Sequence, residues 1–323
     1  MEPRSNKVLE IRHISEAANE ILDYINHRRK GIIKSLKTRW PKFNRQCMGG
    51  IEPNVIYSIC GISGSGKSSF ANSLETDLFE LNPDDDFVVL NFNFEMLSSK
   101  QVGRKLSYKL NRTTSELYSA SNTDDSYRVS DVDYEEILKQ TEKIKQYPIY
   151  YVDCPGTVDE IRNTIVGFQM LEEMKGKWLI VILDHTLLTK GRQTESEREI
   201  ISDLQRMFME RKKHGKISII QLSQMNREIE DKDRINNPNL HYPMRRDIFG
   251  SDSIFQTSDY VIVLHRPEII GIVDYGPNKQ PVENRIYMHF LKNREGEPKI
   301  FKFENNLKYN RIDEINDYNN LEI

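Results

Sequence analysis

The sequence predicts an α/β fold in which a mainly parallel, twisted sheet is covered by helices on both faces. From Val55 onward, short and almost entirely apolar segments alternate with stretches of helical periodicity. Such apolar runs are typical of parallel strands that are buried on both faces. The last apolar segments follow one another without a helical stretch between them, which indicates an antiparallel edge. With 323 residues, of which 37% are hydrophobic and 29% charged, the chain can bury a substantial core.

The apolar segments are the predicted strands, and the periodic stretches between them are the predicted helices. Strands are expected at residues 55–60, 87–94, 148–153, 178–183, 217–222, 260–264, 286–291 and 299–303. Helices are expected at residues 98–111, 134–146, 158–175 and 196–214. Polar stretches at residues 119–131 and 226–253 interrupt the alternation. The second stretch is long for a loop in a compact domain, and such loops are often functional or mobile.

An amphipathic helix is predicted ahead of the sheet, within residues 8–37. Its apolar residues recur at helical spacing, and its polar side carries the basic run "HRRK". The apolar positions are Ala18, Ile21, Leu22, Ile25, Ile32, Ile33 and Leu36. Such a helix can pack on its own domain or dock its apolar stripe on a neighbouring subunit, and the pattern leaves both interpretations open.

The segment "GISGSGKSS", residues 61–69, matches G-x-x-x-x-G-K-[ST], the phosphate-binding loop of many nucleotide hydrolases. Glycines let backbone N–H groups face the phosphates, and the following helix directs its positive end at them. We expect Lys67 to reach the β- and γ-phosphates and Ser68 to offer its hydroxyl to Mg²⁺. The candidate nucleotide-binding residues are Gly61, Ser63, Gly64, Ser65, Gly66, Lys67, Ser68 and Ser69. The motif predicts a bound nucleoside triphosphate, but not the process that its hydrolysis drives.

Polar side chains end three of the other predicted strands. Asp184 closes "WLIVILD" and can hold Mg²⁺ together with Ser68, although a strand-terminal Asp is often only a turn residue. Glu95 follows "NFNF" and can orient or deprotonate the attacking water, or can simply be an exposed residue that opens a helix. Gln224, in "IIQLSQ", can hydrogen-bond a γ-phosphate oxygen or a neighbouring loop. Because parallel strands end at the same edge of a sheet, we expect these side chains to converge on the phosphate-binding loop.

Composition excludes several classes of protein. No apolar run approaches the roughly 20 residues that span a bilayer, and the N-terminus lacks the apolar core of a signal peptide. The three cysteines are far apart and lack metal-ligand spacing, so we expect reduced thiols and no zinc site. A cytoplasmic protein without a membrane partner is therefore expected. The net charge of −3 does not by itself indicate nucleic-acid binding.

Taken together, these motifs resemble a known family, the RecA-like ATPase domain of DnaB-type replicative helicases. The matching blocks, which follow the family's order over about residues 35–305, are "GISGSGKS", "NFEM", "VILDHTLL", "QLSQMNRE", "RDIFGSDSIFQTSDYVIVLHR" and "FLKNREGEP". The resemblance implies a RecA-like fold with ATP and Mg²⁺ as cofactors. It also implies that Glu95 is the catalytic carboxylate, Asp184 the magnesium-shell residue and Gln224 the nucleotide sensor.

The resemblance further implies a ring of identical subunits, expected to be a hexamer. In "LKNR", which matches the family's K-x-R, Lys292 and Arg294 would reach the γ-phosphate of the next subunit, with Arg294 as arginine finger. A solvated hairpin tip is the alternative interpretation of "KNRE". The N-terminal helix resembles the family's linker helix, which packs on the adjacent protomer. The expected parts are a linker and oligomerisation helix at 1–37, an ATPase domain at 38–305 and an acidic tail at 306–323.

The chain departs from the family in the loop that binds DNA. Its counterpart here is "DIFGSDS", with Phe249 where the family has a basic residue and Asp252 where glycine is common. The candidate DNA-binding residues are Lys190, Arg192, Arg245, Arg246, Gly250 and Ser251. We expect a helicase that translocates on single-stranded DNA, with a primase or loader as further partners. The alternative is a non-unwinding RecA-like ATPase that controls assembly.

The resemblance does not extend to the family's N-terminal helical collar or to a primase domain, and we expect the chain to have neither. We therefore expect a minimal core, encoded by a phage or another mobile element and active in the bacterial cytoplasm or in an infected host cell.

Overall fold

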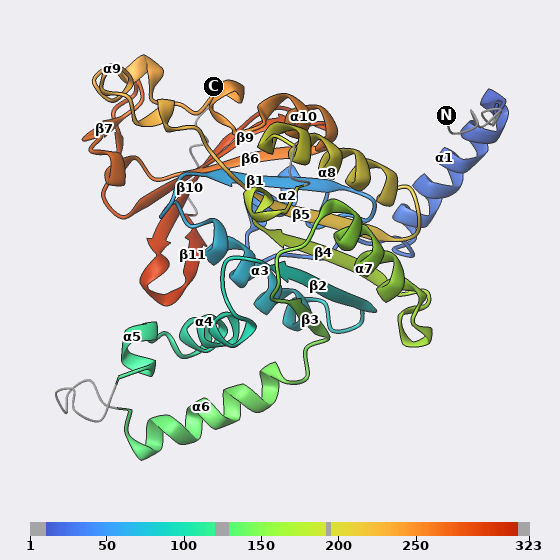
Figure 1. Cartoon of the computed structure of the whole chain (residues 1–323), viewed down its shortest axis with the longest axis horizontal. Coiled ribbons are helices and arrows are strands. Elements are labelled where there is room, and N and C mark those ends of the chain that lie inside the picture. The colour runs from blue at the N-terminus through green and yellow to red at the C-terminus, as the bar shows by residue number, and fades with distance from the viewer. Residues whose placement is uncertain (1–10, 120–128, 192–194, 316–323) are drawn as a thin grey trace. The chain divides into compact units, whose positions relative to one another are not determined.

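The structure, a computed structural model, describes residues 11–119, 129–191 and 195–315 of the chain. Its central feature is a sheet with the strand order β11-β10-β9-β6-β1-β5-β4-β2-β3 (Figure 1). The strands of this sheet are β1 (Ile56–Gly61), β2 (Phe87–Asn93), β3 (Ile149–Val152), β4 (Trp178–Asp184), β5 (Ile217–Gln224), β6 (Tyr260–His265), β9 (Arg285–Asn293), β10 (Ile300–Asn306) and β11 (Arg311–Glu314). A separate hairpin joins β7 (Asp274–Tyr275) to β8 (Gln280–Pro281).

The six strands from β6 to β3 in that order are parallel, whereas β9, β10 and β11 add an antiparallel edge. The predicted mixed sheet is therefore confirmed. β11 pairs with β10, so residues 311–314 of the expected acidic tail belong to the sheet. Residues 316–323 of that tail lie outside the described residues.

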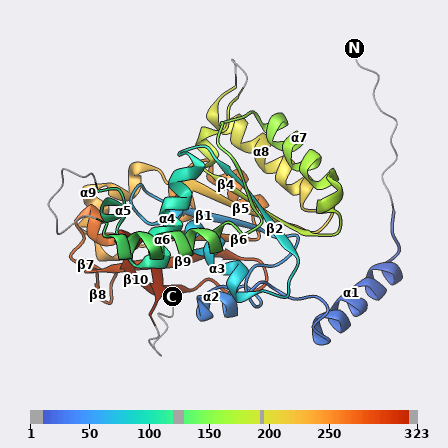
Figure 2. The same cartoon turned by 90° about the horizontal axis from the view of Figure 1, so that it is seen from below.

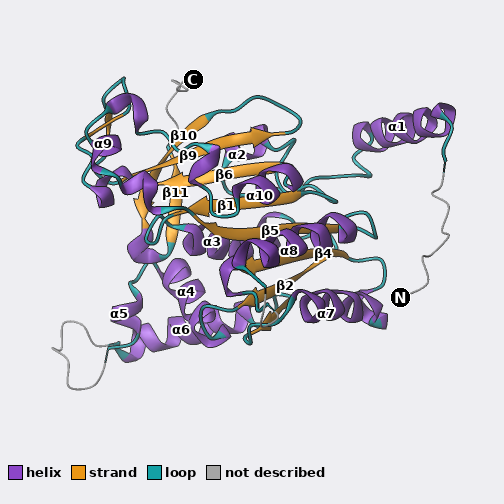
Figure 3. Ribbon diagram, turned by 45° about the horizontal axis from the view of Figure 1, so that its top comes forward, coloured by secondary structure: helices purple, strands orange, loops and turns teal. Residues whose placement is uncertain are grey.

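Helices cover both faces of the sheet (Figures 2 and 3). The α-helices are α1 (Ile14–Arg29), α2 (Pro41–Gln46), α3 (Lys67–Leu81), α4 (Ser98–Leu110), α5 (Thr114–Leu117), α6 (Asp131–Ile144), α7 (Val158–Met170), α8 (Glu197–Arg211), α9 (Lys232–Ile235) and α10 (Ser251–Thr257). Short 3₁₀ helices include η3 (Thr186–Leu188), η6 (Arg245–Asp247) and η7 (Pro267–Ile270). The long polar stretch at 226–253 thus consists mostly of single helical turns.

The two faces of β4 show how the sheet is buried. Ile180 and Ile182 belong to the apolar core beneath α3. Leu179, Val181 and Leu183 alternate with them and belong to the core beneath α7 and α8. Successive side chains of a strand point to opposite faces, which explains why this strand is apolar throughout. The two cores hold the sheet rigid and so fix the positions of its strand ends.

The N-terminal region differs from its prediction. Residues 1–35 and 36–323 form two compact units. Helix α1 ends at Arg29, before Gly31, whose φ of +70° marks a turn. Leu36, which was assigned to the helical stripe, is buried in the second unit, where it forms a β-bridge with Ile51. The joining segment also contributes Trp40 and its neighbour helix α2 to the core beneath α3.

Among the described residues, no helix has the length and apolarity that crossing a membrane requires.

Candidate active site

The nucleotide loop (residues 61–69) joins the end of β1 to the start of α3. Gly64 and Gly66 have φ angles of +76° and +103°, which L side chains rarely adopt. A Cβ atom on Gly61 would lie 2.2 Å from the Ser65 hydroxyl and 2.8 Å from the Leu264 carbonyl oxygen. No side chain caps the N-terminus of α3, so its first N–H groups are left for an anion. The backbone therefore has the shape and polarity that suit a phosphate.

Lys67 lies folded back into this loop. Its Nζ atom donates hydrogen bonds to the carbonyl oxygens of Gly61 (2.7 Å) and Ile62 (2.9 Å) and to Gln224 Oε1 (3.4 Å). Burial lowers the pKa of Lys67 to about 8, and the negative charge of Asp184 opposes that change. A triphosphate in the loop would give the ammonium charged oxygens in place of neutral carbonyls, which strengthens each hydrogen bond.

Asp184 ends β4 beside the nucleotide loop and is only 2% exposed. Burial, followed by the nearby charge of Glu95, raises its pKa to about 6. A hydrogen bond from the Ser68 hydroxyl and the positive charge of Arg104 oppose the rise. The Ser68 hydroxyl and the Asp184 carboxylate thus place two oxygen groups side by side, and Mg²⁺ bound to a nucleotide ordinarily takes only one or two oxygen ligands from the protein.

Glu95 follows β2 on the same edge of the sheet and is exposed. The amide of the preceding residue, Phe94, donates a 2.9 Å hydrogen bond to the Asp184 carbonyl oxygen, which fixes the two strand ends side by side. The charge of Glu95 acts on both Asp184 and Lys67. With Gln224 at the end of β5, the expected convergence on adjacent strands β1, β5, β4 and β2 is observed.

His185, next to Asp184, is also close to this cluster. Its pKa is lowered by burial, with an opposing effect from the charge of Glu95. Its Nδ1 atom is buried without a hydrogen-bond partner among the described residues. A neutral imidazole at this position places a further polar group beside the two carboxylates.

Lys292 and Arg294 lie at the other end of the strands, where the parallel strands β1 and β6 begin. β9 is antiparallel to β6, and Asn293 pairs with Tyr260, which in turn pairs with Tyr57 near the start of β1. The nucleotide loop begins four residues further along β1, about 13 Å away at 3.3 Å per residue. Neither cation can therefore serve the nucleotide loop of its own chain.

The two cations contact different elements. Lys292 Nζ donates hydrogen bonds to the carbonyl oxygens of Phe255 (2.6 Å) and Gln256 (3.3 Å), near the end of α10. The Arg294 side chain is 44% exposed, and its Nη1 atom lies 3.2 Å from Asp259 Oδ1. Arg294 therefore lies at the surface, where a second molecule can reach it.

The loop predicted to bind DNA lies beside β5. The Phe249 amide donates a 3.1 Å hydrogen bond to the Gln224 carbonyl oxygen, so the loop is attached to the strand that carries the predicted nucleotide sensor. Asp252 forms a 2.6 Å ion pair with Arg245, which also stacks on the Phe255 ring. The acidic residue that departs from the family pattern is thus neutralised within the loop. Arg246 is exposed beside it.

Gly250 ends this loop in a left-handed conformation, with a φ of +67°, and is the N-cap of α10. The helix then begins at Ser251. A Cβ atom on Gly250 would lie 3.1 Å from the Ile201 side chain of α8, so the loop packs closely on that helix. The small residue therefore sets both the turn and the distance between α10 and α8.

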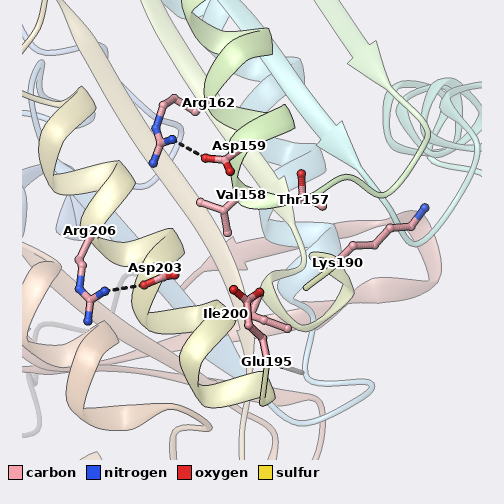
Figure 4. A pocket seen from close by; sticks show the side chains of 9 residues that line it. All are labelled: Thr157, Val158, Asp159, Arg162, Lys190, Glu195, Ile200, Asp203 and Arg206. Carbon is pink, nitrogen blue, oxygen red and sulfur yellow. Dashed lines mark hydrogen bonds and ion pairs between the residues drawn. The ribbon is translucent and has the colours of Figure 1, made fainter. Parts of the chain in front are cut away.

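Lys190 is exposed after β4, in a cavity of about 310 Å³ between the N-terminal turns of α7 and α8 (Figure 4). Its amide donates a 2.9 Å hydrogen bond to the Gly156 carbonyl oxygen. The other charged side chains of α7 and α8 here are paired within their own helices, Asp159 with Arg162 and Asp203 with Arg206. The Lys190 ammonium points away from these pairs in Figure 4. Arg192 lies outside the described residues.

Comparison with known proteins identifies the family. The sequence model of the DnaB-like helicase C terminal domain matches residues 35–314. The chain belongs to this family. It is 28% identical over 179 residues to the replicative DNA helicase DnaB of Mycobacterium leprae. These aligned residues make up 55% of this chain and 27% of that protein. It is 25% identical over 273 residues to the replicative DNA helicase DnaC of Bacillus subtilis, which covers 84% of this chain and 54% of that protein.

Solved structures show the same fold. One solved ATPase domain superposes with a TM-score of 0.77 at 19% identity, over 95% of this chain and all of that one. A DnaB-like replicative helicase, studied with its interactions with primase, gives a TM-score of 0.76 at 19% identity, over 95% of this chain and 68% of that one. The DnaB-like chain therefore has the RecA-like fold, as its motifs predict. It spans about half or less of the length of the curated relatives described above.

The DnaB-like domain brings the predicted site residues to two edges of one sheet, while their individual roles stay predictions. Sequence reasoning missed the hydrogen bond between Phe249 and Gln224, because main-chain contacts leave no sequence signature. It also missed Asp259 as the partner of Arg294. An Asp just ahead of a strand is an ordinary turn residue, and nothing nearby in the sequence indicates its charged partners.

Proposed function

We propose that this DnaB-like chain is the motor of a replicative DNA helicase, which hydrolyses ATP and translocates along single-stranded DNA as a ring. The observation that carries the proposal is the separation of the ATP machinery onto two edges of the sheet. The nucleotide loop and its carboxylates lie at one edge, and Lys292 and Arg294 lie at the other. A complete site therefore requires a second copy of the chain. In a ring, each subunit can supply its Lys292 and Arg294 to the nucleotide loop of the next, so that every site is complete.

In this proposal the nucleotide loop holds the triphosphate through the backbone N–H groups of α3 and the Lys67 ammonium. The Ser68 hydroxyl and the Asp184 carboxylate would hold Mg²⁺. A bound Mg²⁺ ion would neutralise part of the negative charge of the phosphates. The exposed Glu95 carboxylate accepts a proton from the attacking water, and Gln224 contacts the γ-phosphate. Arg294 of the adjacent subunit neutralises the charge that develops on the transferred phosphoryl group, with Lys292 beside it.

Single-stranded DNA would bind at the loops that follow β4 and β5. Lys190, Arg192, Arg245 and Arg246 supply cations for the phosphates, and the backbone at Gly250 and Ser251 supplies N–H donors. The hydrogen bond between Phe249 and Gln224 gives DNA in this loop a direct effect on the strand that ends at the γ-phosphate.

The exposed apolar side chains of α1, including Ile21, Leu22 and Ile25, suit docking on an adjacent subunit. We propose a hexamer as the ring, a primase or loader as further replication partners, and the cytoplasm as the place of action. These finer statements follow from the likeness to DnaB-type helicases.

One observation favours a second candidate function, a RecA-like ATPase that controls assembly without unwinding DNA. In the loop, Phe249 occupies the position of a basic residue, and Arg245 is engaged by Asp252. Both features reduce the positive charge that the loop can offer to phosphates.

ATP turnover, measured with and without single-stranded DNA, distinguishes the two functions. A helicase motor should hydrolyse ATP much faster when DNA is present, and a Lys67→Ala variant should give the background rate under both conditions. Turnover that is equal with and without DNA would select the second function. Turnover no higher than in the Lys67→Ala variant would contradict both.

A further inference from the structure

The Asp259 carboxylate, just ahead of β6, contacts one backbone N–H group and two cationic side chains. Its side chain is 8% exposed, and its Oδ2 atom accepts a 2.8 Å hydrogen bond from the Ile56 amide. The Lys212 ammonium contacts both carboxylate oxygens, at 3.0 and 2.8 Å. Arg294 Nη1 lies 3.2 Å from Oδ1. A single buried carboxylate is therefore shared by the arginine finger and a lysine from another element.

The two cations are held differently. Lys212 is the C-cap of α8, and its side chain is 11% exposed, against 44% for Arg294. The Arg294 main chain is fixed by a 3.0 Å hydrogen bond from its amide to the Asp259 carbonyl oxygen. Rotation of the Arg294 side chain can therefore carry the guanidinium outward while the backbone stays in place. Lys212 is enclosed and stays with the carboxylate.

We propose that Lys212 is a positioning residue for the arginine finger: by neutralising Asp259, it allows Arg294 to leave that carboxylate for the triphosphate of the adjacent subunit. This inference rests on the function proposed above. A buried carboxylate that loses its last cation is strongly destabilised. With Lys212 present, the departure of Arg294 leaves Asp259 paired. Without Lys212, the same departure would leave a buried charge with no counter-ion.

Repulsion between the neighbouring cations also favours the release of Arg294. The pKa of Lys292 is lowered by burial and then by the charge of Arg294; the charge of Asp259 opposes this change, and Lys212 and Arg245 make smaller lowering contributions. Arg294 and Lys212 thus share the Asp259 carboxylate with Lys292 nearby, whereas Arg245 is paired with Asp252. A triphosphate arriving from the adjacent subunit would relieve this excess of positive charge.

A Lys212→Met variant tests the inference, since methionine keeps the apolar stem and removes the charge. We expect kcat for DNA-stimulated ATP hydrolysis to fall about tenfold or more, given the cost of an unpaired buried charge. KM for ATP should stay unchanged, because the subunit's own nucleotide loop is intact. Lys212→Arg keeps a positive charge beside Asp259 and should hydrolyse ATP at nearly the parental rate. The matched control is Lys213→Met, because the adjacent Lys213 is exposed and its variant should hydrolyse ATP at the parental rate.

A double variant separates positioning from a structural role. Asp259→Asn keeps an oxygen that can accept the Ile56 amide but removes the charge that retains Arg294. If Lys212 acts through that charge, Asp259→Asn should be nearly as active as the parent. Combined with Lys212→Met, it should return turnover to nearly the same level. A double variant as slow as Lys212→Met would overturn the inference, and so would an Asp259→Asn protein as slow as Lys212→Met. Thermal unfolding shows whether each variant is folded.

An Arg294→Ala variant distinguishes failure of this inference from failure of the proposed function. If Arg294→Ala is inactive while Lys212→Met hydrolyses ATP at the parental rate, only the role of Lys212 is wrong. If Arg294→Ala is fully active, the finger assignment fails and the inference fails with it. If both variants are slow and Asp259→Asn rescues only Lys212→Met, the inference stands.

Discussion

At the scale of single residues, two carboxylates of the candidate site lie in opposite environments. Asp184 is 2% exposed, and burial raises its pKa to about 6, whereas Glu95 is open to solvent. The buried carboxylate, joined to the Ser68 hydroxyl, suits a fixed ligand position. The exposed carboxylate can meet a water molecule and pass its proton onward. In the proposed function, metal binding therefore belongs to Asp184 and water activation to Glu95.

This division predicts the behaviour of a Glu95→Gln variant. The amide keeps the size of the side chain but cannot accept a proton, so turnover should fall by roughly 10²–10⁴-fold. Binding of ATP should be nearly unchanged, because Lys67 and the amides of α3 are intact. Direct titration with ATP and a turnover assay would measure the two quantities. Glu173→Gln is the matched control, because Glu173 is exposed near the start of β4, away from the site. Parental turnover in Glu95→Gln would mean that another group positions the water.

At the scale of elements, the ends of β6 and β7 meet the middle of β9 in a buried polar cluster that contains His265, Tyr275 and His289. The Tyr275 hydroxyl lies 2.7 Å from His265 Nδ1 and 2.7 Å from His289 Nε2. Burial lowers the pKa of His265 to about 3 and that of His289 well below its usual value. Both imidazoles are therefore neutral in the folded protein at pH 7.

Because both histidines have lower pKa values in the folded state than in the unfolded state, the unfolded state binds more protons below about pH 6.5. Their contribution to stability is complete above that pH and is lost as the pH falls toward the folded-state values. We expect a loss of about 2 kcal/mol from His265 between pH 7.5 and pH 5, and a further loss of the same sign from His289. Urea denaturation at the two pH values would measure it. A His289→Gln variant should lose less stability over the same interval, and an equal loss would contradict the assignment.

The sequence predicts the long elements well and the short ones poorly. The eight-residue β5 is a largely apolar run, and the fifteen-residue α8 carries clear helical periodicity. β11 has four residues and β7 only two, which is too few for a pattern. Leu36 fits the apolar stripe of α1 by spacing alone, although tertiary packing places it in the core beneath α3. Local periodicity cannot show which distant surface an apolar side chain will meet.

The candidate site is predictable to a similar extent. Gly66 and Lys67 belong to a motif, and Asp184 ends a strand, so local sequence locates them. The contacts of Asp259 with Arg294 and Lys212 bring together residues that are far apart in the sequence. Only the register of β9 on β6 places those residues together, and register does not follow from the pattern of either strand. The ion pairs that Asp259 forms with Arg294 and Lys212 could therefore not be predicted from the sequence.

At the scale of the whole molecule, the sheet separates the two groups of residues that form one ATP site in the proposed ring. The parallel strands carry the nucleotide loop at one edge, and the reversed direction of β9 carries Lys292 and Arg294 to the other. In the proposed function, this reversal makes one chain insufficient. A monomer would bind ATP and hydrolyse it slowly, so turnover should depend on assembly.

Mixing two inactive variants tests this arrangement. Lys67→Ala subunits should not bind ATP but still offer Arg294, whereas Arg294→Ala subunits bind ATP but offer no finger. Alone, Arg294→Ala should bind ATP nearly normally and turn it over about 10³-fold more slowly, as expected for a lost arginine finger. A mixed ring contains some interfaces in which an intact nucleotide loop faces an intact finger. Those interfaces should recover part of the parental turnover.

The recovery should follow the proportion of such interfaces, which is highest when the two variants are mixed in equal amounts. Turnover measured across mixing ratios should therefore rise from near zero, pass through a maximum at an equal ratio and fall again. Native mass spectrometry of the same samples would establish that mixed rings form. A ring containing both variants but with no recovered turnover would mean either that all sites must fire in strict sequence or that Arg294 acts within its own subunit. The register of β9 argues against the second explanation, because Arg294 lies at the edge of the sheet opposite its own nucleotide loop.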